Sequence, residues 1–261
     1  MKLLSNGIQN HKIKKNIKLG YLTFSLNLAH SNLSGYNVCA KAKKLIQDPI
    51  NKSSGSSKLA DCSATCVAGN GFASIYSAVL ESRIKKTIAF KKDTKFFLNS
   101  LAYEIEKAIK QANNKNLIPS FRLNAYSDIC WERYIIKDGK NIFQLFPEID
   151  FYDYSKLLNR KVPSNYQLTY SHYGNWNETK SALNQGLNVA MVFQALPNQI
   201  TINNIVYTVI SGDASDLRLN EKINNKPVIV GLKFKGSREK LISAIAGRFA
   251  IPLKESYYYY V

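Results

Sequence analysis

Hydrophobic positions in the first part of the chain predict one strand followed by two helices. Residues 21–29, YLTFSLNLA, alternate apolar side chains with others, as a half-buried strand does. In residues 71–84 the apolar side chains, Val79 and Ile84 among them, recur at helical spacing. Asp93 is a residue type that caps helices. The helix expected after it has an apolar stripe that comprises Phe97, Leu101, Ile105, Ala108, Ile109 and Ala112.

Short apolar runs follow one another after residue 118, and each ends in polar or charged residues. Stretches of helix length separate several of these runs, as in residues 177–186 and 237–249. Strands that alternate with helices indicate an α/β fold with a largely parallel sheet. We therefore expect a full or partial β/α barrel, in which functional groups gather at the carboxyl ends of the strands. An open, doubly wound sheet is the alternative.

Length and composition favour one globular domain. The chain has 261 residues, of which 45% are apolar, so it can bury a core without covalent cross-links. No repeat of fixed period and no clear domain boundary interrupts the pattern. We expect a basic N-terminal segment, residues 1–34, and a single α/β domain, residues 35–261, in which a cysteine-containing loop and two helices precede the sheet.

The charge of the chain suggests a polyanionic partner without naming one. Lysine and arginine number 36 against 18 acidic residues, which gives a formal net charge of +18. Residues 1–60 contain ten lysines and a single acid, Asp48. Such a segment suits contact with phosphate groups, so nucleic acid is a candidate partner. A requirement for solubility alone would explain the same excess.

The chain carries no sign of secretion or membrane insertion. Its start, MKLLSNGIQNHKIKK, lacks the apolar core of a secretory signal. No apolar run approaches the ~18 residues that span a bilayer. We expect a cytoplasmic protein with no membrane partner, whose cysteines are reduced unless they hold a metal.

Three cysteines lie ahead of the predicted helices. Cys39, Cys62 and Cys66 follow the spacing C-x22-C-x3-C, and the glycine-rich residues 69–71 come soon after. Thiolates bind zinc and iron well, and three of them can hold an iron–sulfur cluster that leaves one iron open. Cys130 is a candidate fourth ligand. Unrelated thiols explain the spacing equally well.

Polar side chains follow the predicted strands, and in a barrel they would converge on one mouth. Carboxylates there can transfer protons, while lysines, arginines and hydroxyls can bind an anionic ligand. Acids after strands also serve as caps and turn formers. His172 lies in the same region, where a structural hydrogen-bonding role is the commoner one. The catalytic candidates are Asp128, Asp153, Asp213, Asp216 and Arg218, and the ligand-binding candidates are Lys156, Ser171, Lys233 and Lys235.

Several common catalytic motifs are missing from the sequence. No G-x-S-x-G marks a serine hydrolase of the nucleophile-elbow type. No G-x-x-x-x-G-K-[ST] marks a phosphate-binding loop, and no G-x-G-x-x-G follows a predicted strand.

Strings at the strand ends resemble the phage gene product 88 family. In order they are FRLNAYSDICWE, FPEIDFYDYSK, SNYQLTYS, NVAMVF, SGDASDLR and VIVGLKFKG, and the similarity runs over about residues 35–236. The resemblance implies a phage or prophage context, hence the cytoplasm of a host cell, rather than an activity. It also implies an N-terminal cysteine cluster, which Cys39, Cys62 and Cys66 match despite a long insertion between the first two.

A cysteine cluster ahead of a β/α barrel is also similar, at the level of fold, to radical-SAM enzymes. Their cluster loop is C-x3-C-x2-C, of which only C-x3-C is present, at Cys62 and Cys66. The likeness would imply an iron–sulfur cluster used with S-adenosylmethionine, and fold-level likeness does not establish function.

Three hypotheses about function remain. The first is an enzyme with a cysteine-bound metal or iron–sulfur site and an anionic, phosphate- or nucleic-acid-related ligand. The second is a basic accessory protein that binds nucleic acid and holds a structural zinc or no metal. The third is a metal-free barrel enzyme that acts on a phosphorylated small molecule.

Overall fold

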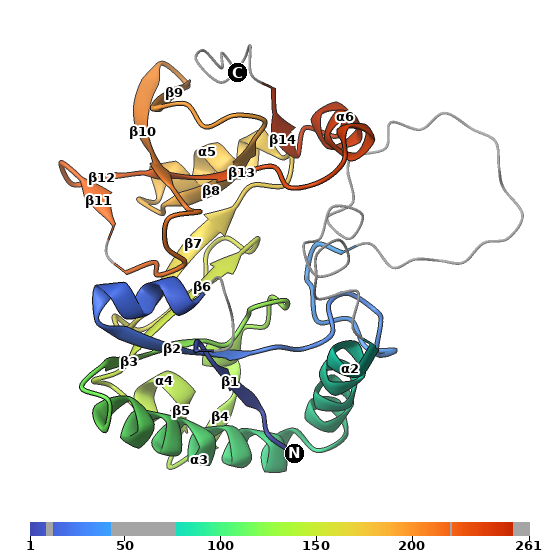
Figure 1. Cartoon of the computed structure of the whole chain (residues 1–261), viewed down its shortest axis with the longest axis vertical. Helices are drawn as coiled ribbons and strands as arrows, with labels where there is room; N and C mark the ends of the chain where they lie inside the picture. Colours follow the sequence, from blue (N-terminus) through green and yellow to red (C-terminus); the bar gives the residue numbers. More distant parts are fainter. Residues whose placement is uncertain (9–12, 43–76, 220, 253–261) are drawn as a thin grey trace, which may run out of the picture.

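The computed structural model describes residues 1–8, 13–42, 77–219 and 221–252 (Figure 1). Cys62, Cys66 and residues 69–71 lie outside the described residues, as does most of the predicted cysteine-containing loop. The prediction that three cysteines come together is therefore not tested by the fold.

A single ten-stranded sheet runs through the molecule. Its strands, in spatial order, are β1 (Leu4–Asn6), β2 (Tyr21–Leu26), β3 (Ile118–Arg122), β6 (Asp150–Ser155), β7 (Tyr166–Ser171), β8 (Val189–Phe193), β13 (Ile229–Lys233), β10 (Ile205–Ser211) and β9 (Gln199–Ile202), with β14 (Ala250–Ile251) beside β8. All pairings from β2 to β10 are parallel, and only β1 and β9 join antiparallel, each at an edge. Two small ribbons complete the strands: β4 (Ile135–Lys137) with β5 (Lys140–Asn141), and β11 (Lys222–Ile223) with β12 (Lys226–Pro227).

The prediction of an α/β fold with a mostly parallel sheet is confirmed. The strand order follows the chain from β2 through β3, β6 and β7 to β8, as expected of a singly wound sheet. Within the described part of the chain, no pairing joins edge strands β1 and β9, so a closed barrel is not seen. The expected N-terminal segment, residues 1–34, contributes β1 and β2 to this sheet.

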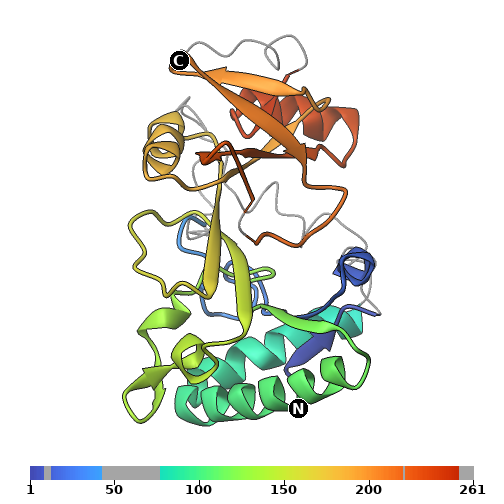
Figure 2. The ribbon, with the colours of Figure 1, turned by 90° about the vertical axis from the view of Figure 1, so that its left-hand side faces the viewer.

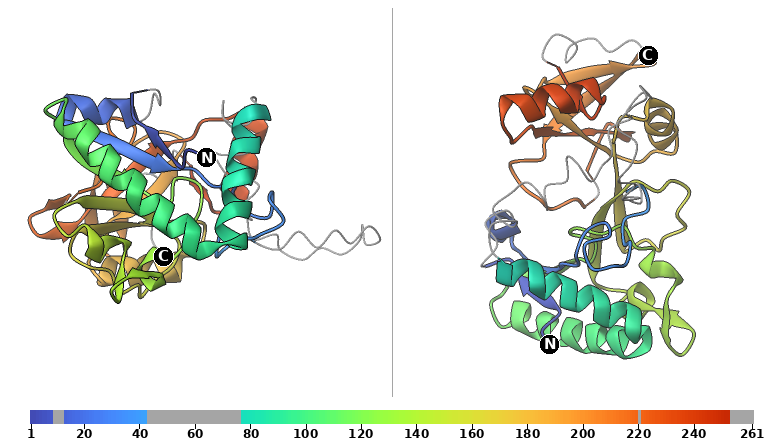
Figure 3. Two further views of the ribbon diagram at one scale, coloured as in Figure 1. Left: turned by 90° about the horizontal axis from the view of Figure 1, so that it is seen from below. Right: turned by 90° about the vertical axis from the view of Figure 1, so that its right-hand side faces the viewer.

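Helices cover the sheet at both ends of the molecule. They are the 3-10 helices η1 (Ile13–Leu19) and η3 (Trp131–Arg133) and the α-helices α2 (Ser77–Lys92), α3 (Thr94–Asn113), α4 (Ile142–Leu145), α5 (Trp176–Asn184) and α6 (Arg238–Ala246). Figures 1 and 2 show α2 and α3 at the end that carries β1 to β3, and α5 and α6 at the end that carries β8 to β14. The views from below and from the right-hand side in Figure 3 agree with this arrangement.

The sequence pattern predicts α3 well. The Asp93 side chain accepts a hydrogen bond from the Phe96 backbone N–H at 2.9 Å, which satisfies a donor that the helix start leaves free. The stripe that begins at Phe97 and Leu101 is buried against the sheet, beside stacked Phe24 and Phe121. Burial of such side chains contributes about 1.5–3 kcal/mol each.

Helix α2 differs from its prediction, because its buried face is partly charged. Val79, part of the expected apolar stripe, is exposed, whereas Arg83 and Lys86 are buried. The Nζ of Lys86 donates to the backbone oxygen of Leu3 at 2.9 Å, and the Arg83 guanidinium lies over the Tyr126 ring. Long side chains of this kind can bury their stems in place of apolar residues.

The direction of the parallel strands indicates at which edge of the sheet a ligand site is expected. Strands β2, β3, β6, β7, β8 and β13 all run in the same direction, so their carboxyl ends lie along the same edge of the sheet. Ligands of open α/β sheets bind outside that edge. No helix among the described residues combines the length and apolar character that crossing a membrane requires.

Candidate functional site

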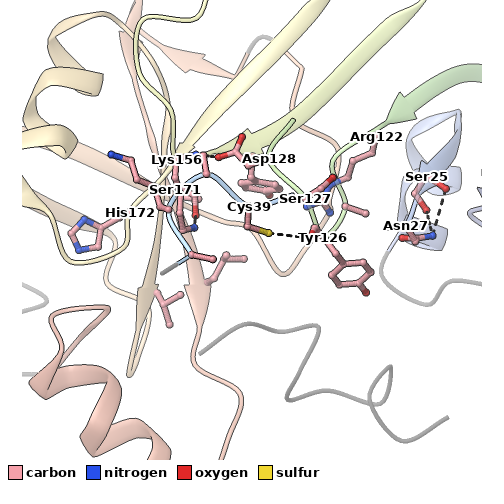
Figure 4. Close-up of a pocket in the computed structure, with 18 of the residues that line it drawn as sticks. Ser25, Asn27, Cys39, Arg122, Tyr126, Ser127, Asp128, Lys156, Ser171 and His172 are labelled. Carbon is pink, nitrogen blue, oxygen red and sulfur yellow. Dashed lines mark hydrogen bonds between the residues drawn. The ribbon is translucent and has the colours of Figure 1, made fainter. Parts of the chain in front are cut away.

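A pocket of about 280 Å³ lies along the carboxyl ends of the strands. We call it the strand-end pocket (Figure 4). Its described walls are mostly apolar, with Val192, Leu232 and Phe249 among them. The chemically important residues that line it are Cys39, Lys41, Arg122, Asp128, Lys156 and Ser171.

Lys156 and Ser171 form a direct pair inside the strand-end pocket. The parallel register of β6 and β7 pairs Ser155 with Tyr170. The residues that follow them, Lys156 and Ser171, therefore lie side by side. The Nζ of Lys156 donates a hydrogen bond to the Oγ of Ser171 at 2.8 Å. The Ser171 hydroxyl keeps its own proton for a further acceptor, and the ammonium group has two more to donate.

Asp128 fixes the end of strand β6. Its Oδ1 accepts from the Ser155 hydroxyl at 2.7 Å, and its Oδ2 accepts from the Lys156 backbone N–H at 2.8 Å. The Arg160 guanidinium lies 3.5 Å from the same carboxylate. Asp128 is therefore held in place at the pocket wall, directly beside the residue whose side chain reaches Ser171.

Arg122, at the end of β3, is the most firmly held cation of the pocket. Its Nη1 donates to Asp216 Oδ2 at 2.6 Å, and its guanidinium lies over the Tyr154 ring at 4.8 Å. Burial alone would lower the pKa of Arg122, but the charge of Asp216 and the neighbouring groups raise it, so the group stays protonated. Its Nε has no hydrogen-bond partner among the described residues and lies 3.9 Å from Asp153.

Asp153 is buried behind Arg122 and does not line the strand-end pocket. Its oxygens accept from the Asn124 backbone N–H at 2.8 Å and from the Tyr166 hydroxyl at 3.0 Å. Burial raises the pKa of Asp153 to about 7, although Arg122 and both hydrogen bonds oppose the rise. Asp153 therefore supports the pocket wall.

Arg218 also packs behind the pocket. Its Nε donates to the Tyr154 hydroxyl at 2.9 Å, and its other nitrogens contact Glu221 and the backbone oxygen of Ser215. Because Tyr154 lines the strand-end pocket, Arg218 fixes a wall residue without facing a ligand itself. Asp216, from the same loop, holds Arg122 as described above.

The remaining strand-end candidates form a separate group at the surface. Asp213 accepts from the Lys233 backbone N–H at 3.0 Å and pairs with the Nζ of Lys235 at 2.6 Å. The Lys235 side chain is 75% exposed, so solvent screens this pair. None of the three residues lines the strand-end pocket. The structure thus divides the predicted site into a pocket group, a supporting group and a surface group.

His172 lines the pocket as a neutral, hydrogen-bonded side chain. Its Nδ1 lies 2.7 Å from the Thr179 hydroxyl, and its Nε2 lies 3.0 Å from the backbone oxygen of Arg248. Burial lowers the pKa of His172 to about 4. Both ring nitrogens are occupied by the protein, which agrees with the structural role expected for this residue.

Of the two described cysteines, Cys39 and Cys130, Cys39 lines the strand-end pocket. Its Sγ accepts from the Ser31 backbone N–H at 3.2 Å and lies 3.6 Å from the backbone oxygen of Tyr126. Cys130 shares with Cys39 a neighbouring cavity of about 280 Å³, and burial raises the pKa of its thiol. In residues 1–8, 13–42, 77–219 and 221–252, no three histidine, cysteine or acidic side chains group as metal ligands.

Two cationic residues of the strand-end pocket, Arg122 and Lys41, were not predicted from the sequence. Arg122 lies in the string FRLN at the end of β3, so its position at a strand end could have identified it. Lys41 lies two residues after Cys39, and its Nζ pairs with Glu178 at 2.8 Å. Nothing in the sequence connects Lys41 with Glu178, which lies on the distant helix α5.

Comparison with known proteins identifies the family of the chain. The family described as Gene product 88 matches residues 2–250, which is nearly the whole length. Searches of curated proteins and of solved structures give no match. The match extends beyond residues 35–236, where the strand-end strings already resembled this family. The chain therefore belongs to the phage gene product 88 family.

Proposed function

We propose that this protein is an enzyme whose strand-end pocket binds a small anionic molecule. The observation that carries the proposal is the charge of the described pocket wall. Three cationic side chains, Lys41, Arg122 and Lys156, line it against a single acid, Asp128. Lys41 pairs with Glu178 and Arg122 with Asp216, whereas the Nζ of Lys156 contacts the Ser171 hydroxyl. In a largely apolar enclosure, an ammonium group beside a hydroxyl favours a negatively charged ligand.

The arrangement of these groups suggests how the ligand is held. Lys156 and Ser171 supply donors for an oxyanion, such as a phosphate or carboxylate group. Apolar side chains, among them Val192 and Leu232, face the same space and suit the uncharged part of the molecule. A phosphorylated small molecule or a nucleotide combines both features. The location at strand carboxyl ends is typical of α/β enzymes, partial barrels included.

Asp128 is the group to which we assign proton transfer. It is the single carboxylate of the described pocket wall, and Ser155 and the Lys156 backbone fix its two oxygens. A positioned carboxylate within reach of a bound substrate can act as a general acid or base. Asp153 is excluded from direct contact by its burial behind Arg122.

We also propose a metal centre, with Cys39 as one of its ligands. The Cys39 sulfur lies in the pocket wall, where it accepts the Ser31 N–H and lies 3.6 Å from the backbone oxygen of Tyr126. Cys39 would hold an iron–sulfur cluster or a zinc ion, with Cys62 and Cys66 as the other predicted ligands. A cluster used with S-adenosylmethionine would supply one-electron chemistry. Iron and sulfide in anaerobically purified protein, lost in Cys39→Ala, are the expected result; a metal-free protein under those conditions would refute this part.

Binding of anionic compounds tests the main proposal. Thermal unfolding is measured with a panel of phosphorylated and carboxylated metabolites and with their uncharged counterparts. We expect at least one anionic compound to stabilise the wild type and to lose its effect in Lys156→Met. Lys235→Met is the matched control, because that lysine lies outside the pocket. Equal stabilisation of both variants would place the ligand elsewhere.

A second candidate function, nucleic-acid binding, is favoured by the outer face of α2 and α3. Two aromatic side chains, Phe96 and Tyr103, are exposed there, and bases stack on such rings. Lys107 lies over the Tyr103 ring, and the other exposed lysines on these helices and between them include Lys85, Lys91, Lys92, Lys95 and Lys110. This function would need a structural zinc or no metal.

Salt dependence separates the second candidate from the first. Binding of single-stranded and duplex DNA or RNA should weaken steeply as salt rises, because phosphate contacts release counterions. Replacing Lys91, Lys92 and Lys95 together with glutamate should abolish the binding. No binding at ~50 mM salt would remove this candidate.

A further inference from the structure

A second buried cationic group lies apart from the strand-end pocket. It comprises Arg83 on α2 with His30 and Ser31 in the segment after β2, and we call it the Arg83 cluster. All three side chains are at least nine-tenths buried, with exposures of 6%, 9% and 5%. None of them lines the strand-end pocket. The cluster is therefore separate from the anion contacts proposed for that pocket, although the Ser31 backbone N–H contacts Cys39.

Tyr126 and Cys39 connect the members of the cluster. The Arg83 guanidinium lies 4.1 Å from the centre of the Tyr126 ring. The backbone oxygen of Tyr126 lies beside the Cys39 sulfur, which accepts the Ser31 backbone N–H. The charge of Arg83 is also close enough to His30 to lower the pKa of that imidazole, in addition to the effect of burial.

The cluster leaves several buried polar atoms unsatisfied. Among the described residues, Arg83 Nε, Arg83 Nη1, Ser31 Oγ and His30 Nδ1 have no hydrogen-bond partner. A buried charge without a partner destabilises the fold, and so does each buried polar atom that lacks a hydrogen bond. Four such atoms on three neighbouring side chains are more than ordinary packing explains.

No described carboxylate neutralises this charge. Lys86, one turn further along α2, is a second buried cation: burial lowers its pKa most, the charge of Glu104 opposes this effect, and the charge of Arg83 adds to it. The oxygens of Glu104 already accept from the backbone N–H groups of Leu3 and Leu4 at 2.7–3.0 Å. The cluster thus holds an excess of positive charge together with unused donors.

The backbone of Ser31 adds an independent sign of a built site. Its φ of 54° lies in the left-handed region, which a residue other than glycine or asparagine seldom adopts. This conformation directs the Ser31 N–H to the sulfur of Cys39. Strained residues of this kind persist where the surrounding structure holds them for a purpose.

We propose that the Arg83 cluster binds an oxyanion, either a phosphate or a carboxylate group. Arg83 supplies its charge and two N–H donors, and the Ser31 hydroxyl donates a third hydrogen bond. The Nδ1 of His30 supplies another donor when it carries a proton, which a nearby anion favours. Binding would remove the cost of the unsatisfied atoms, and this is the source of its affinity.

Thermal unfolding in the Lys156→Met background isolates the cluster from the strand-end pocket. Inorganic phosphate and acetate are the two probes, so the experiment distinguishes a phosphate site from a carboxylate site. We expect at least one probe to stabilise Lys156→Met and its affinity to fall at least tenfold when Arg83→Met is added. Arg133→Gln, which removes an exposed arginine of η3, should keep the full effect.

Two results would overturn the proposal. One is the absence of stabilisation by either probe in Lys156→Met, and the other is equal stabilisation with and without Arg83. If Arg83→Met does not fold, Ser31→Gly provides the test, because glycine suits the φ of this position and lacks the hydroxyl. A several-fold loss of affinity in Ser31→Gly supports the site, and unchanged affinity contradicts it.

Discussion

The Nζ of Lys156 donates to the Oγ of Ser171 at 2.8 Å, and the two residues come from the ends of adjacent parallel strands. Both side chains face the strand-end pocket. Lys156→Met removes a charge-assisted bond to an anionic ligand, so we expect affinity to fall about 10- to 100-fold. Ser171→Ala removes a neutral donor and should cost about tenfold or less.

Calorimetric titration with an anionic compound that stabilises the wild type measures both effects. Lys235→Met, the surface control, should bind as the wild type does. The assignment would fail if Ser171→Ala lost more affinity than Lys156→Met, because the ammonium group would then not be the main anion contact.

The pair between Arg122 and Asp216 stabilises the fold as well as the pocket. The Asp216 side chain is 0% exposed and the Arg122 side chain 13% exposed. Asp216→Asn leaves a buried guanidinium without its charged partner, so we expect the free energy of unfolding to fall by about 3–5 kcal/mol. Urea unfolding at neutral pH measures the change.

Asp213→Asn is the matched control for that substitution. Asp213 lies on the same loop, but its partner Lys235 is exposed to solvent, so the loss should stay below about 1 kcal/mol. Equal losses in the two variants would show that Arg122 does not depend on Asp216.

Asp153 should make the protein less stable as pH rises. The pKa of Asp153 is about 7 in the fold and 3.8 in an unperturbed carboxyl, so between these values the folded chain binds more protons than the unfolded chain. The contribution of Asp153 to the free energy of unfolding therefore falls as pH rises from about 4 to about 7. Asp153→Asn removes this contribution, which is of the order of a few kcal/mol.

Urea unfolding of wild type and Asp153→Asn at about pH 5 and about pH 8 checks the sign. The wild type should lose stability relative to the variant at the higher pH. A difference that is the same at both values would mean that Asp153 titrates normally.

His172 should act in the opposite direction. The pKa of His172 is about 4 in the fold and 6.5 in an unperturbed imidazole, so between these values the unfolded chain binds more protons. The contribution of His172 to the free energy of unfolding therefore rises with pH from about 4 to about 6.5, by up to about 3 kcal/mol. Urea unfolding at about pH 4 and about pH 7 should show the wild type gaining stability relative to His172→Gln at the higher pH, and a constant difference would contradict this assignment.

The sequence predicts the elements of this fold better than it predicts the site. Helix α3 follows from Asp93 and its apolar stripe, because capping and burial there are local properties. The buried face of α2 could not be predicted, since Arg83 and Lys86 take apolar positions through contacts with Tyr126 and Leu3.

The sequence also could not predict which strand-end residues line the pocket and which support it from behind. Side chains on a strand alternate between its faces, so Asp153 and Lys156, three positions apart, point in opposite directions. One supports Arg122 from behind while the other reaches Ser171. Asp213 and Asp216 lie on the same loop, but Asp213 pairs with Lys235 and Asp216 pairs with Arg122. Which partner each acid meets depends on how the strands pair in the sheet.

We expect an oxyanion to bind in the strand-end pocket beside Lys156 and Ser171. Anomalous diffraction from crystals soaked in selenate locates such an anion through the scattering of selenium. The expected peak lies beside Lys156 Nζ and Ser171 Oγ and is absent in Lys156→Met crystals. Selenate found only at other positions would mean that the pocket does not bind the oxyanion.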